Sequence, residues 1–314
     1  MSSSAIKISV AMCTYNGEKY IAHQLQSILN QTVPVDEIIV CDDNSSDRTT
    51  SVIQEIQASS NVDIKLIVNQ PNIGISANFT KAIGLCTGDI IFLSDQDDIW
   101  LPEKVATTMV WFESHPECEV VFSNGYFMDG NEASFTHRTM FEAAAFTPKA
   151  QKAFEMGFQL EAFLKNNRAT GAAMAFRRRF VPCFTIEQTA TIRNRKPLHD
   201  EMIALAAACK NQLGFITQPL IRYRVHTEQE AGYGSWIVKP PHTSDLIKPL
   251  VPSPDIIDFI PAEAKQRALF GIKRRQYRKI YHKWQVLIHK EEYQSHYGQY
   301  YYRPWLRDLF WLWV

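Results

Sequence analysis

Three carboxylates stand close together in the run Asp95-Gln96-Asp97-Asp98, which is separated by one residue, Ser94, from the apolar stretch Ile90–Leu93. Like charges a few ångströms apart repel each other unless a cation lies among them. Carboxylates on a short segment after a strand suit Mg²⁺ or Mn²⁺, which commonly bind one or two carboxylates together with substrate phosphates. The run therefore predicts a divalent-metal site, with a solvated acidic turn as the alternative.

The segments around this run alternate between strand-like and helix-like patterns. Alternating or continuous apolar residues predict strands, whereas apolar residues at helical spacing predict helices. This order predicts an α/β fold in which a mostly parallel sheet is flanked by helices with right-handed crossovers. The predicted strands cover residues 6–12, 37–41, 64–68, 90–93, 120–122 and 214–217, and the predicted helices cover residues 18–30, 47–59, 75–85, 102–112 and 202–209.

Polar loops follow the first three predicted strands as well. They are Thr14–Gly17, Asp42–Asp47 and Asn69–Gly74. In an open α/β sheet, ligands bind beyond the carboxyl ends of the strands. One polar loop says little, but loops rich in Asp or Asn at successive strand ends, together with the carboxylate run, predict one binding site along this edge.

The composition of the 314-residue chain argues against some functions. Its formal net charge is zero, which argues against a nucleic-acid-binding protein, and its hydrophobic content of 46% suffices for one large domain or a domain with an extension. The six cysteines are scattered without a Cys-x-x-Cys pair, which predicts buried free thiols in a reducing cytosol. Residues 1–5 carry no apolar signal segment, and no apolar stretch reaches the roughly 18–20 residues that span a bilayer. We therefore expect a cytoplasmic protein.

The pattern is weaker over residues 125–167, which are rich in aromatic residues. These side chains either pack in the core or line an acceptor-binding wall, and the sequence does not choose between the two. Residues 169–176 are mostly small, which predicts close backbone packing near a site. The aromatic residues of segment 125–167 include Phe135, Phe141, Phe146, Phe154, Phe158 and Phe163.

Taken in order, these segments resemble the family 2 glycosyltransferases, which have the GT-A fold. The likeness covers residues 5–235 and is strongest for bacterial rhamnosyltransferase-type enzymes that build O-antigen, capsule or exopolysaccharide. It implies an inverting, metal-assisted transfer of a sugar from a nucleotide-sugar to an acceptor hydroxyl. The motifs that carry it are Thr14–Gly17, Asp42–Asp47, Asn72–Gly74, Ser94–Trp100, Thr170-Gly171, His199-Asp200 and Tyr223–His226.

The resemblance implies roles on the metal side of the site. Asp97 matches the family's metal-contacting carboxylate, and Asp95 matches its companion, which usually faces the ribose of the nucleoside. His226 matches a histidine that completes the metal or diphosphate site in many relatives, and a neutral imidazole suits Mn²⁺ better than Mg²⁺. Arg222 and Arg224 are close enough in sequence to offer phosphate contacts, with a structural role for one of them as the alternative. The implied cofactor is Mg²⁺ or Mn²⁺, which stabilises the charge that develops on the leaving nucleoside diphosphate.

An inverting transfer also needs a general base that takes the proton of the acceptor hydroxyl. Asp200 matches the family's base at the start of a helix, where the helix dipole keeps a carboxylate ionised, and a plain helix cap is the alternative. Glu201 replaces the aromatic residue common in relatives, and this second carboxylate competes for the assignment. His199 is expected to shape the pocket and not to transfer protons.

The first loops are expected to hold the nucleoside. The resemblance implies contacts with the base and ribose from Thr14, Tyr15 and Asn16. It implies that Asp43 reads the edge of the base, and that the diphosphate–ribose side is lined by Asn72 and Gly74. The expected donor is a UDP-, GDP- or dTDP-linked sugar, and the expected acceptor is a glycan or a lipid-linked oligosaccharide.

We expect a catalytic domain over residues 1–235, with a nucleotide-sugar-binding half at 5–123 and an acceptor-side half at 124–235. Residues 236–314 then form a Pro-rich linker and a helical extension rich in basic and aromatic residues. Its segment 265–290 holds nine Lys or Arg residues and no acidic residue. This composition suits an anionic membrane surface and predicts peripheral attachment to the inner face of the cytoplasmic membrane. Packing of the extension on the catalytic domain is the alternative.

Two other functions stay open. A sugar nucleotidyltransferase would also combine a parallel sheet with a carboxylate-bound metal, but it usually has a glycine-rich basic loop after the first strand, which Thr14–Lys19 is not. A catalytically inactive nucleotide-binding scaffold protein is disfavoured by the presence of Asp97, Asp200 and His226. Only a measurement of turnover distinguishes such a scaffold protein from an active enzyme.

Overall fold

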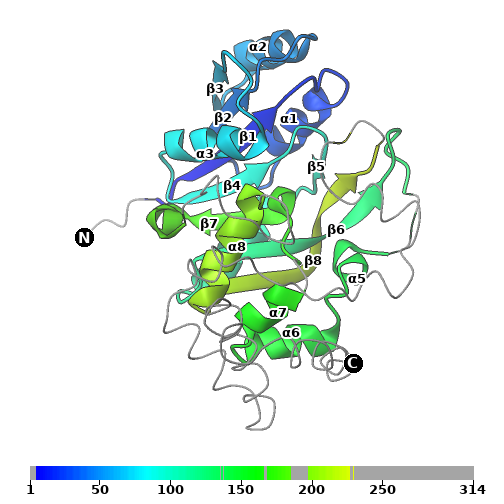
Figure 1. Ribbon diagram of the computed structural model, residues 1–314. Coiled ribbons are helices and arrows are strands. Elements are labelled where there is room, and N and C mark those ends of the chain that lie inside the picture. Colours follow the sequence, from blue (N-terminus) through cyan, green and yellow to red (C-terminus); the bar gives the residue numbers. More distant parts are fainter. Residues whose placement is uncertain are drawn as a thin grey trace, which may run out of the picture.

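An eight-stranded sheet with helices on both faces forms the body of the protein (Figure 1). A computed structural model describes residues 5–134, 136, 138–165, 168–184, 197–226 and 229. The strand order is β3-β2-β1-β4-β7-β6-β8-β5. The strands are β1 (Ile8–Thr14), β2 (Glu37–Asp42), β3 (Asp63–Val68), β4 (Ile90–Ser94), β5 (Ile99–Trp100), β6 (Val120–Met128), β7 (Met174–Arg177) and β8 (Leu213–Arg224).

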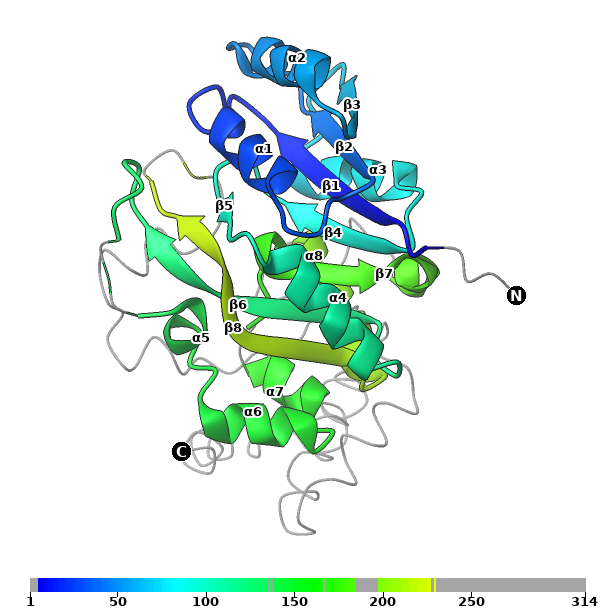
Figure 2. The same cartoon turned by 180° about the vertical axis from the view of Figure 1, so that it is seen from behind.

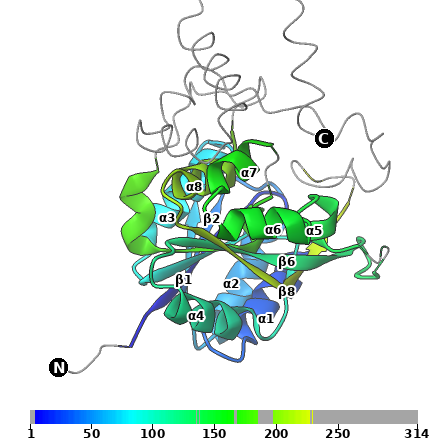
Figure 3. The ribbon, with the colours of Figure 1, turned by 90° about the horizontal axis from the view of Figure 1, so that it is seen from below.

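The helices cover the sheet in two layers, which the views from behind and below separate (Figures 2 and 3). One layer holds α1 (Ile21–Leu29), α2 (Thr49–Ser59) and α4 (Lys104–Ser114). The other holds α3 (Ile75–Leu85), α6 (Pro148–Glu155), α7 (Gln159–Lys165) and α8 (His199–Cys209). The short elements are α5 (Met140–Ala143) and the 3₁₀ turns η1 (Gly171–Ala173) and η2 (Arg178–Cys183).

The central strands are buried on both faces, which explains their continuous apolar sequences. Side chains of a strand point alternately to the two faces. In β1, Val10 and Met12 pack on the side of α1, α2 and α4, whereas Ala11 and Cys13 pack on the side of α3 and α8. The sheet thus separates two hydrophobic cores, and the loops at its carboxyl edge are held by rigid elements.

The structure confirms the predicted α/β fold and refines its second half. Strands β3, β2, β1 and β4 are parallel neighbours, but β7 is antiparallel to both β4 and β6. The boundary predicted between residues 123 and 124 falls inside β6, which pairs with β8 along its whole length. The two predicted halves therefore share one sheet. Strand direction escaped the sequence analysis because it depends on the path of the connections and not on residue types.

Several aromatic side chains of residues 125–167 pack in the core, whereas Tyr126 is exposed. Phe146 lies 5.0 Å from both Phe141 and Phe215 between ring centroids, and both contacts are edge-to-face. Phe154 joins this cluster and is 2% exposed. Core packing is therefore the correct alternative for Phe141, Phe146 and Phe154, while Phe135 lies outside the described residues. All six thiols are free, as predicted, and five of them are buried.

The predicted extension at 236–314 lies outside the described residues, so its helical character stays a prediction. Among the helices that the structure does describe, none combines the length and the apolar character needed to cross a membrane.

Candidate active site

The loops after β1 and β2 are locked together by side-chain hydrogen bonds. The Thr14 hydroxyl donates to the Asp42 carboxylate at 2.8 Å. The backbone N–H of Asn16 donates to the Ser45 hydroxyl at 2.9 Å, and the Asn16 amide oxygen accepts from the N–H of Ser46 at 2.8 Å. Asn16 adopts a φ of 47°, a conformation that asparagine tolerates better than most residues. The structure thus brings Thr14 and Asn16 to the predicted edge, while the Tyr15 ring is exposed there.

Asp43 organises the loop after β3. Its carboxylate accepts hydrogen bonds from the backbone N–H groups of Ile73 and Gly74, each at 2.8 Å, and from the Asn69 side chain at 2.7 Å. The Asn72 amide donates to the Asp43 carbonyl at 3.0 Å. The predicted nucleoside residues Asp43, Asn72 and Gly74 therefore lie together. The carboxylate of Asp43 is used to hold this loop, and its contact with a base edge stays a prediction.

Gln96 joins the first loop to the carboxylate loop, a role that the sequence analysis did not assign. Its side-chain oxygen accepts from the N–H of Tyr15 at 2.9 Å, and its amide group donates to the Tyr15 carbonyl at 3.0 Å. Gly17 makes room for this contact, because a Cβ atom at residue 17 would lie 2.2 Å from the Gln96 oxygen. The partners are separated by 81 residues, so no local pattern could have indicated the pairing.

We expect Gly17→Ala and Gln96→Ala to weaken nucleotide-sugar binding to a similar degree. Either change removes both hydrogen bonds to Tyr15, which amounts to about 1–2 kcal/mol, or about five- to thirtyfold in affinity. The double variant should be no weaker than either single variant, because both act on the same contact. Titration of each variant with the donor in a calorimeter measures these affinities.

Gln57→Ala is the matched control, because the Gln57 amide also donates to a backbone carbonyl, that of Ile64, but far from this edge. Its donor affinity should equal that of the unmodified protein. Additive losses from Gly17→Ala and Gln96→Ala would contradict a shared clamp.

The metal side of the site forms where β8 ends beside the loop after β4. The His226 Nε2 atom lies 2.9 Å from Asp97 Oδ2, although the two residues are 129 positions apart. Ligands about 2.1 Å from an octahedral ion, in neighbouring positions, lie about 3.0 Å apart. Asp97 and His226 therefore fit two neighbouring ligand positions of a divalent cation. The described residues hold no group of three His, Cys, Asp or Glu side chains placed for a metal, so further ligands would be phosphate or water oxygens.

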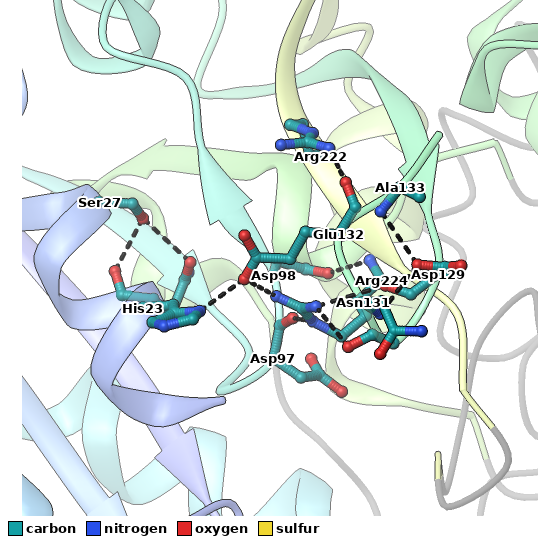
Figure 4. A network of polar contacts seen from close by, with 12 residues as sticks. His23, Ser27, Asp97, Asp98, Asp129, Asn131, Glu132, Ala133, Arg222 and Arg224 are labelled. Atoms are coloured by element: carbon teal, nitrogen blue, oxygen red, sulfur yellow. Dashed lines mark hydrogen bonds and ion pairs between the residues drawn. The ribbon is translucent and has the colours of Figure 1, made fainter. Parts of the chain in front are cut away.

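Arg224 is buried next to Asp97 and binds the loop that carries it. Its guanidinium donates to the Asp97 carbonyl at 2.6 Å and to the Glu132 carboxylate at 3.1 Å (Figure 4). The guanidinium also lies over the Tyr20 ring. Glu132 in turn contacts His23 at 2.5 Å. The Arg224 side chain itself is fully buried. This corrects the prediction of a phosphate contact: the side chain is turned toward the protein, where it positions the backbone of Asp97.

The carboxylates of the loop after β4 and of α8 act on one another electrostatically. Burial raises the pKa of Asp95 to about 7, helped by the negative charges of Asp97 and Asp200 and opposed by Lys104. Burial, together with Asp97 and Asp95, raises the pKa of Asp98 well above its ordinary value. One oxygen of Asp98 is buried without a hydrogen-bond donor among the described residues. This concentration of charge is what a bound cation would stabilise.

Asp200 lies in the first turn of α8, as predicted. Its carboxylate accepts from the N–H of Gly171 at 2.9 Å and from the N–H of Glu201 at 2.8 Å. The Glu201 side chain instead turns back and accepts from the N–H of Leu198 at 3.1 Å, and Glu201 is buried. Glu201 therefore caps the helix. The carboxylate of Glu201 is thus engaged at the start of the helix, and the role of Asp200 as the base stays a prediction.

His199 is buried beside Asp200 and stacks on Phe79 with 3.8 Å between the ring centroids. Burial lowers its pKa to about 3, although Glu201 acts in the opposite direction. The imidazole is therefore neutral at physiological pH, which agrees with a residue that shapes the pocket. Lys104, which the sequence analysis also overlooked, is buried at the start of α4. Its signal was its spacing from Thr108 and Phe112 on the inward face of that helix.

The arrangement of the sheet is shared with solved structures of the GT-A fold. TarS residues 1–349 from S. aureus, in complex with UDP-GlcNAc, match with a TM-score of 0.54 and 15% identity over 96% of this chain and 79% of that chain. The mannosyltransferase PcManGT from Pyrobaculum calidifontis, in complex with GDP-Man and Mn²⁺, matches with a TM-score of 0.53 and 19% identity over 74% and 60%. These likenesses confirm the predicted fold class.

Sequence comparison leads to the family. The chain is 34% identical to the putative glycosyltransferase EpsE of Bacillus subtilis over 119 residues, which are 38% of this chain and 43% of EpsE. It is 36% identical over 98 residues to WfgD of Escherichia coli, a UDP-Glc:alpha-D-GlcNAc-diphosphoundecaprenol beta-1,3-glucosyltransferase, with 31% and 38% covered. Each match thus spans less than half of the relative. The model of glycosyl transferase family 2 matches residues 9–184, and the chain belongs to this family.

Proposed function

We propose that the protein transfers a sugar from a nucleotide-sugar to an acceptor hydroxyl with inversion at the anomeric carbon, assisted by Mg²⁺ or Mn²⁺. The observation that carries this proposal is that the Asp97–His226 pair and the Asp200 carboxylate both lie within electrostatic reach of Asp95. Asp97 and His226 are in contact, and Asp95 is affected by the charges of both Asp97 and Asp200. A metal-binding pair and a candidate base are the two parts that such a transfer requires.

In this mechanism the residues divide into a leaving-group side and an acceptor side. Asp97 and His226 would hold the divalent metal, which supplies electrostatic stabilisation of the leaving diphosphate. Asp200 accepts the proton of the acceptor hydroxyl as that oxygen attacks the anomeric carbon from the opposite face. The N–H of Gly171 keeps the Asp200 carboxylate oriented.

The donor and acceptor are proposed by class. The related structures were solved with UDP-GlcNAc and with GDP-Man and Mn²⁺, which supports a nucleotide-sugar donor. The residues that would hold it are Thr14–Asn16, Asp43 and Asn72–Gly74. The resemblance to rhamnosyltransferases adds dTDP-linked sugars to the candidates. The name of WfgD includes a diphosphoundecaprenol-linked sugar, which supports a lipid-linked oligosaccharide acceptor in surface polysaccharide synthesis.

A panel of UDP-, GDP- and dTDP-sugars tests the proposal. The purified protein is incubated with each donor and a lipid-linked glycan fraction, with MnCl₂, MgCl₂ or EDTA. We expect metal-dependent release of one nucleoside diphosphate and a glycosylated product. Formation of a nucleoside triphosphate and a sugar 1-phosphate when pyrophosphate is added to the donor, without any glycosylated product, would identify a nucleotidyltransferase. Binding of a donor without turnover on any acceptor would favour a scaffold protein.

We also propose that the segment 265–314 attaches the protein to an anionic membrane surface. The support is the acid-free basic segment 265–290, interleaved with aromatic residues, and the aromatic residues Trp305, Trp311 and Trp313 that follow it. Salt screens the attraction of basic residues to anionic lipid, but it does not weaken burial of tryptophan. We therefore expect binding to phosphatidylserine-containing liposomes to weaken with salt without disappearing.

Co-sedimentation with liposomes checks this prediction, with neutral phosphatidylcholine liposomes as the control. Truncation before Lys265 should abolish most of the binding while leaving donor binding unchanged. A full-length protein that stays in the supernatant at low salt would contradict membrane attachment and favour packing of the segment on the catalytic domain.

A further inference from the structure

A glutamine, Gln24, lies on the otherwise apolar face of α1 that packs in the core. Its neighbours on this face are Ile21, Leu25 and Ile28, and all four side chains are fully buried. A primary amide has two donor hydrogens and an acceptor oxygen with two lone pairs, and its burial is costly unless these groups are paired. Neither the proposed metal site nor the proposed base uses Gln24. Its partners lie instead in the loop after β4.

Four polar groups surround the Gln24 amide. The orientation of the amide follows from one distance, because an amide atom lies 2.6 Å from the Asp98 carbonyl oxygen, where only the nitrogen donor fits. The nitrogen then also donates to the Ser27 hydroxyl at 3.2 Å, and the oxygen accepts from the Ser94 hydroxyl at 2.7 Å and from the Trp100 indole N–H at 3.2 Å. Both amide hydrogens and both oxygen lone pairs are paired in this way.

These contacts reach both ends of the carboxylate loop. Ser94 is the last residue of β4 and Trp100 is the last residue of β5, so the partners of Gln24 lie before and after Asp97 in the chain. Ser27 adds a second link from α1, because its hydroxyl accepts from the backbone N–H of Trp100 at 3.0 Å. One face of α1 therefore binds the loop on both sides of Asp97.

Strand β8 binds the same loop. The Arg224 guanidinium donates to the Asp97 carbonyl at 2.6 Å, and the Asp98 carboxylate accepts from the backbone N–H of Arg224 at 2.9 Å. The carbonyls of two successive residues, Asp97 and Asp98, are thus each bound by a buried side chain, one from β8 and one from α1. Two fixed peptide groups set the direction in which the Asp97 side chain leaves the backbone, and this side chain contacts His226.

We propose that Gln24 is a positioning residue, which holds the carboxylate loop in the conformation that brings Asp97 to His226. This inference rests on the proposed metal site. It assigns to Gln24 a role that depends on its hydrogen bond to Asp98 and not on core packing alone. Removing the amide should therefore weaken the binding of a divalent metal, whereas a similar loss of buried hydrogen bonds beside the loop should not.

Gln31→Met is the matched control for Gln24→Met. Gln31 is buried two residues after the end of α1, and its amide pairs with two backbone carbonyls and with the N–H of Val105. It thus makes a comparable set of hydrogen bonds close to the carboxylate loop, but these partners lie outside residues 94–98. In both variants methionine keeps most of the volume of glutamine and removes its amide group.

Binding of Mn²⁺ is measured by electron paramagnetic resonance of free MnCl₂ titrated with protein, in the absence of any donor. We expect Gln24→Met to bind Mn²⁺ about 10-fold more weakly than the unmodified protein. Gln31→Met should bind Mn²⁺ as the unmodified protein does, although both variants should lose thermal stability. Excess MnCl₂ should restore the turnover of Gln24→Met, because the ion selects the loop conformation that binds it. It should leave the turnover of Gln31→Met unchanged.

Hydrogen exchange of the metal-free protein, followed by mass spectrometry, is the second measurement. Gln24→Met should speed exchange in residues 95–99 by at least about fivefold, whereas Gln31→Met should speed it in residues 101–105. If Gln24→Met does not fold, Gln24→Ala replaces it, because the space it opens admits water to the polar groups. Equal Mn²⁺ affinities of the Gln24 and Gln31 variants, or equal exchange in residues 95–99, would overturn the proposal.

These measurements separate the role of Gln24 from the proposed function. If the unmodified protein binds no Mn²⁺, the proposed metal assistance is wrong, and exchange in residues 95–99 still decides whether Gln24 holds the loop. If the unmodified protein binds Mn²⁺ but transfers no sugar, the result counts against the proposed function alone.

Discussion

Replacing Asp97 with alanine should reduce metal-dependent transfer by at least about 10²-fold, the loss found when a group that stabilises developing charge is removed. The carboxylate of Asp97 is the part of the proposed metal site that contacts His226. Donor binding in the presence of Mn²⁺ should weaken as well, since the diphosphate loses its cation. Turnover as a function of Mn²⁺ concentration, with calorimetry of donor binding, measures both effects.

The backbone carbonyl of Asp97, which Arg224 holds, is retained in the Asp97→Ala variant, so the fold should be preserved. Circular dichroism checks this. Asp89→Ala is the matched control, because Asp89 is an exposed aspartate at the opposite end of β4 whose carboxylate accepts from the N–H of Lys7. Its activity should be unchanged. Turnover of Asp97→Ala in MnCl₂ near that of the unmodified protein, lost to the same degree on chelation, would refute the assignment of Asp97 as a ligand.

Replacing Asp200 with asparagine should leave donor binding nearly unchanged and lower kcat by at least about 10²-fold, the low end for loss of a general base. Asparagine keeps one side-chain oxygen, which can accept from the N–H of Gly171, while the basic oxygen and the acceptor for the N–H of Glu201 are lost. Donor affinity by calorimetry and kcat should therefore separate in this variant.

Glu201→Gln is the control for this prediction, because it changes the adjacent carboxylate in the same way. Its side chain caps the start of α8, and the amide oxygen of glutamine can still accept from the N–H of Leu198. We expect a small effect on turnover. A large loss in Glu201→Gln together with a small loss in Asp200→Asn would show that Glu201 is the base and Asp200 the structural residue.

Much of this site could be predicted because its parts lie at the ends of recognisable elements. The apolar stretches of β1, β2 and β4 predict buried strands, and the polar loops that follow them meet at one edge of the sheet. The start of α8 was also visible as a polar segment before an apolar helical run, which located Asp200 in its first turn.

The contacts between distant segments could not be predicted in this way. Arg224 was expected to contact phosphate, because its type and place in the motif suit that role, but the structure surrounds it with Asp97, Glu132 and Tyr20. The sequence also did not show that Gln96 would clamp Tyr15, or that Lys104 would reach Ala172. In each case the residue type permits several partners, and the packing of remote elements selects one.

The sequence by itself determined the α/β class, the edge of the sheet at which the site lies, and the resemblance to family 2 glycosyltransferases. It could do so because periodicity and loop composition report burial and turns within short stretches of chain. The tertiary structure alone decided that β7 runs antiparallel to its neighbours, that His226 meets Asp97 across 129 residues, and that Glu201 caps α8 while Asp200 is held by Gly171. These outcomes depend on how remote segments fill the space between two helical layers and a twisted sheet, and that packing is a property of the whole folded chain.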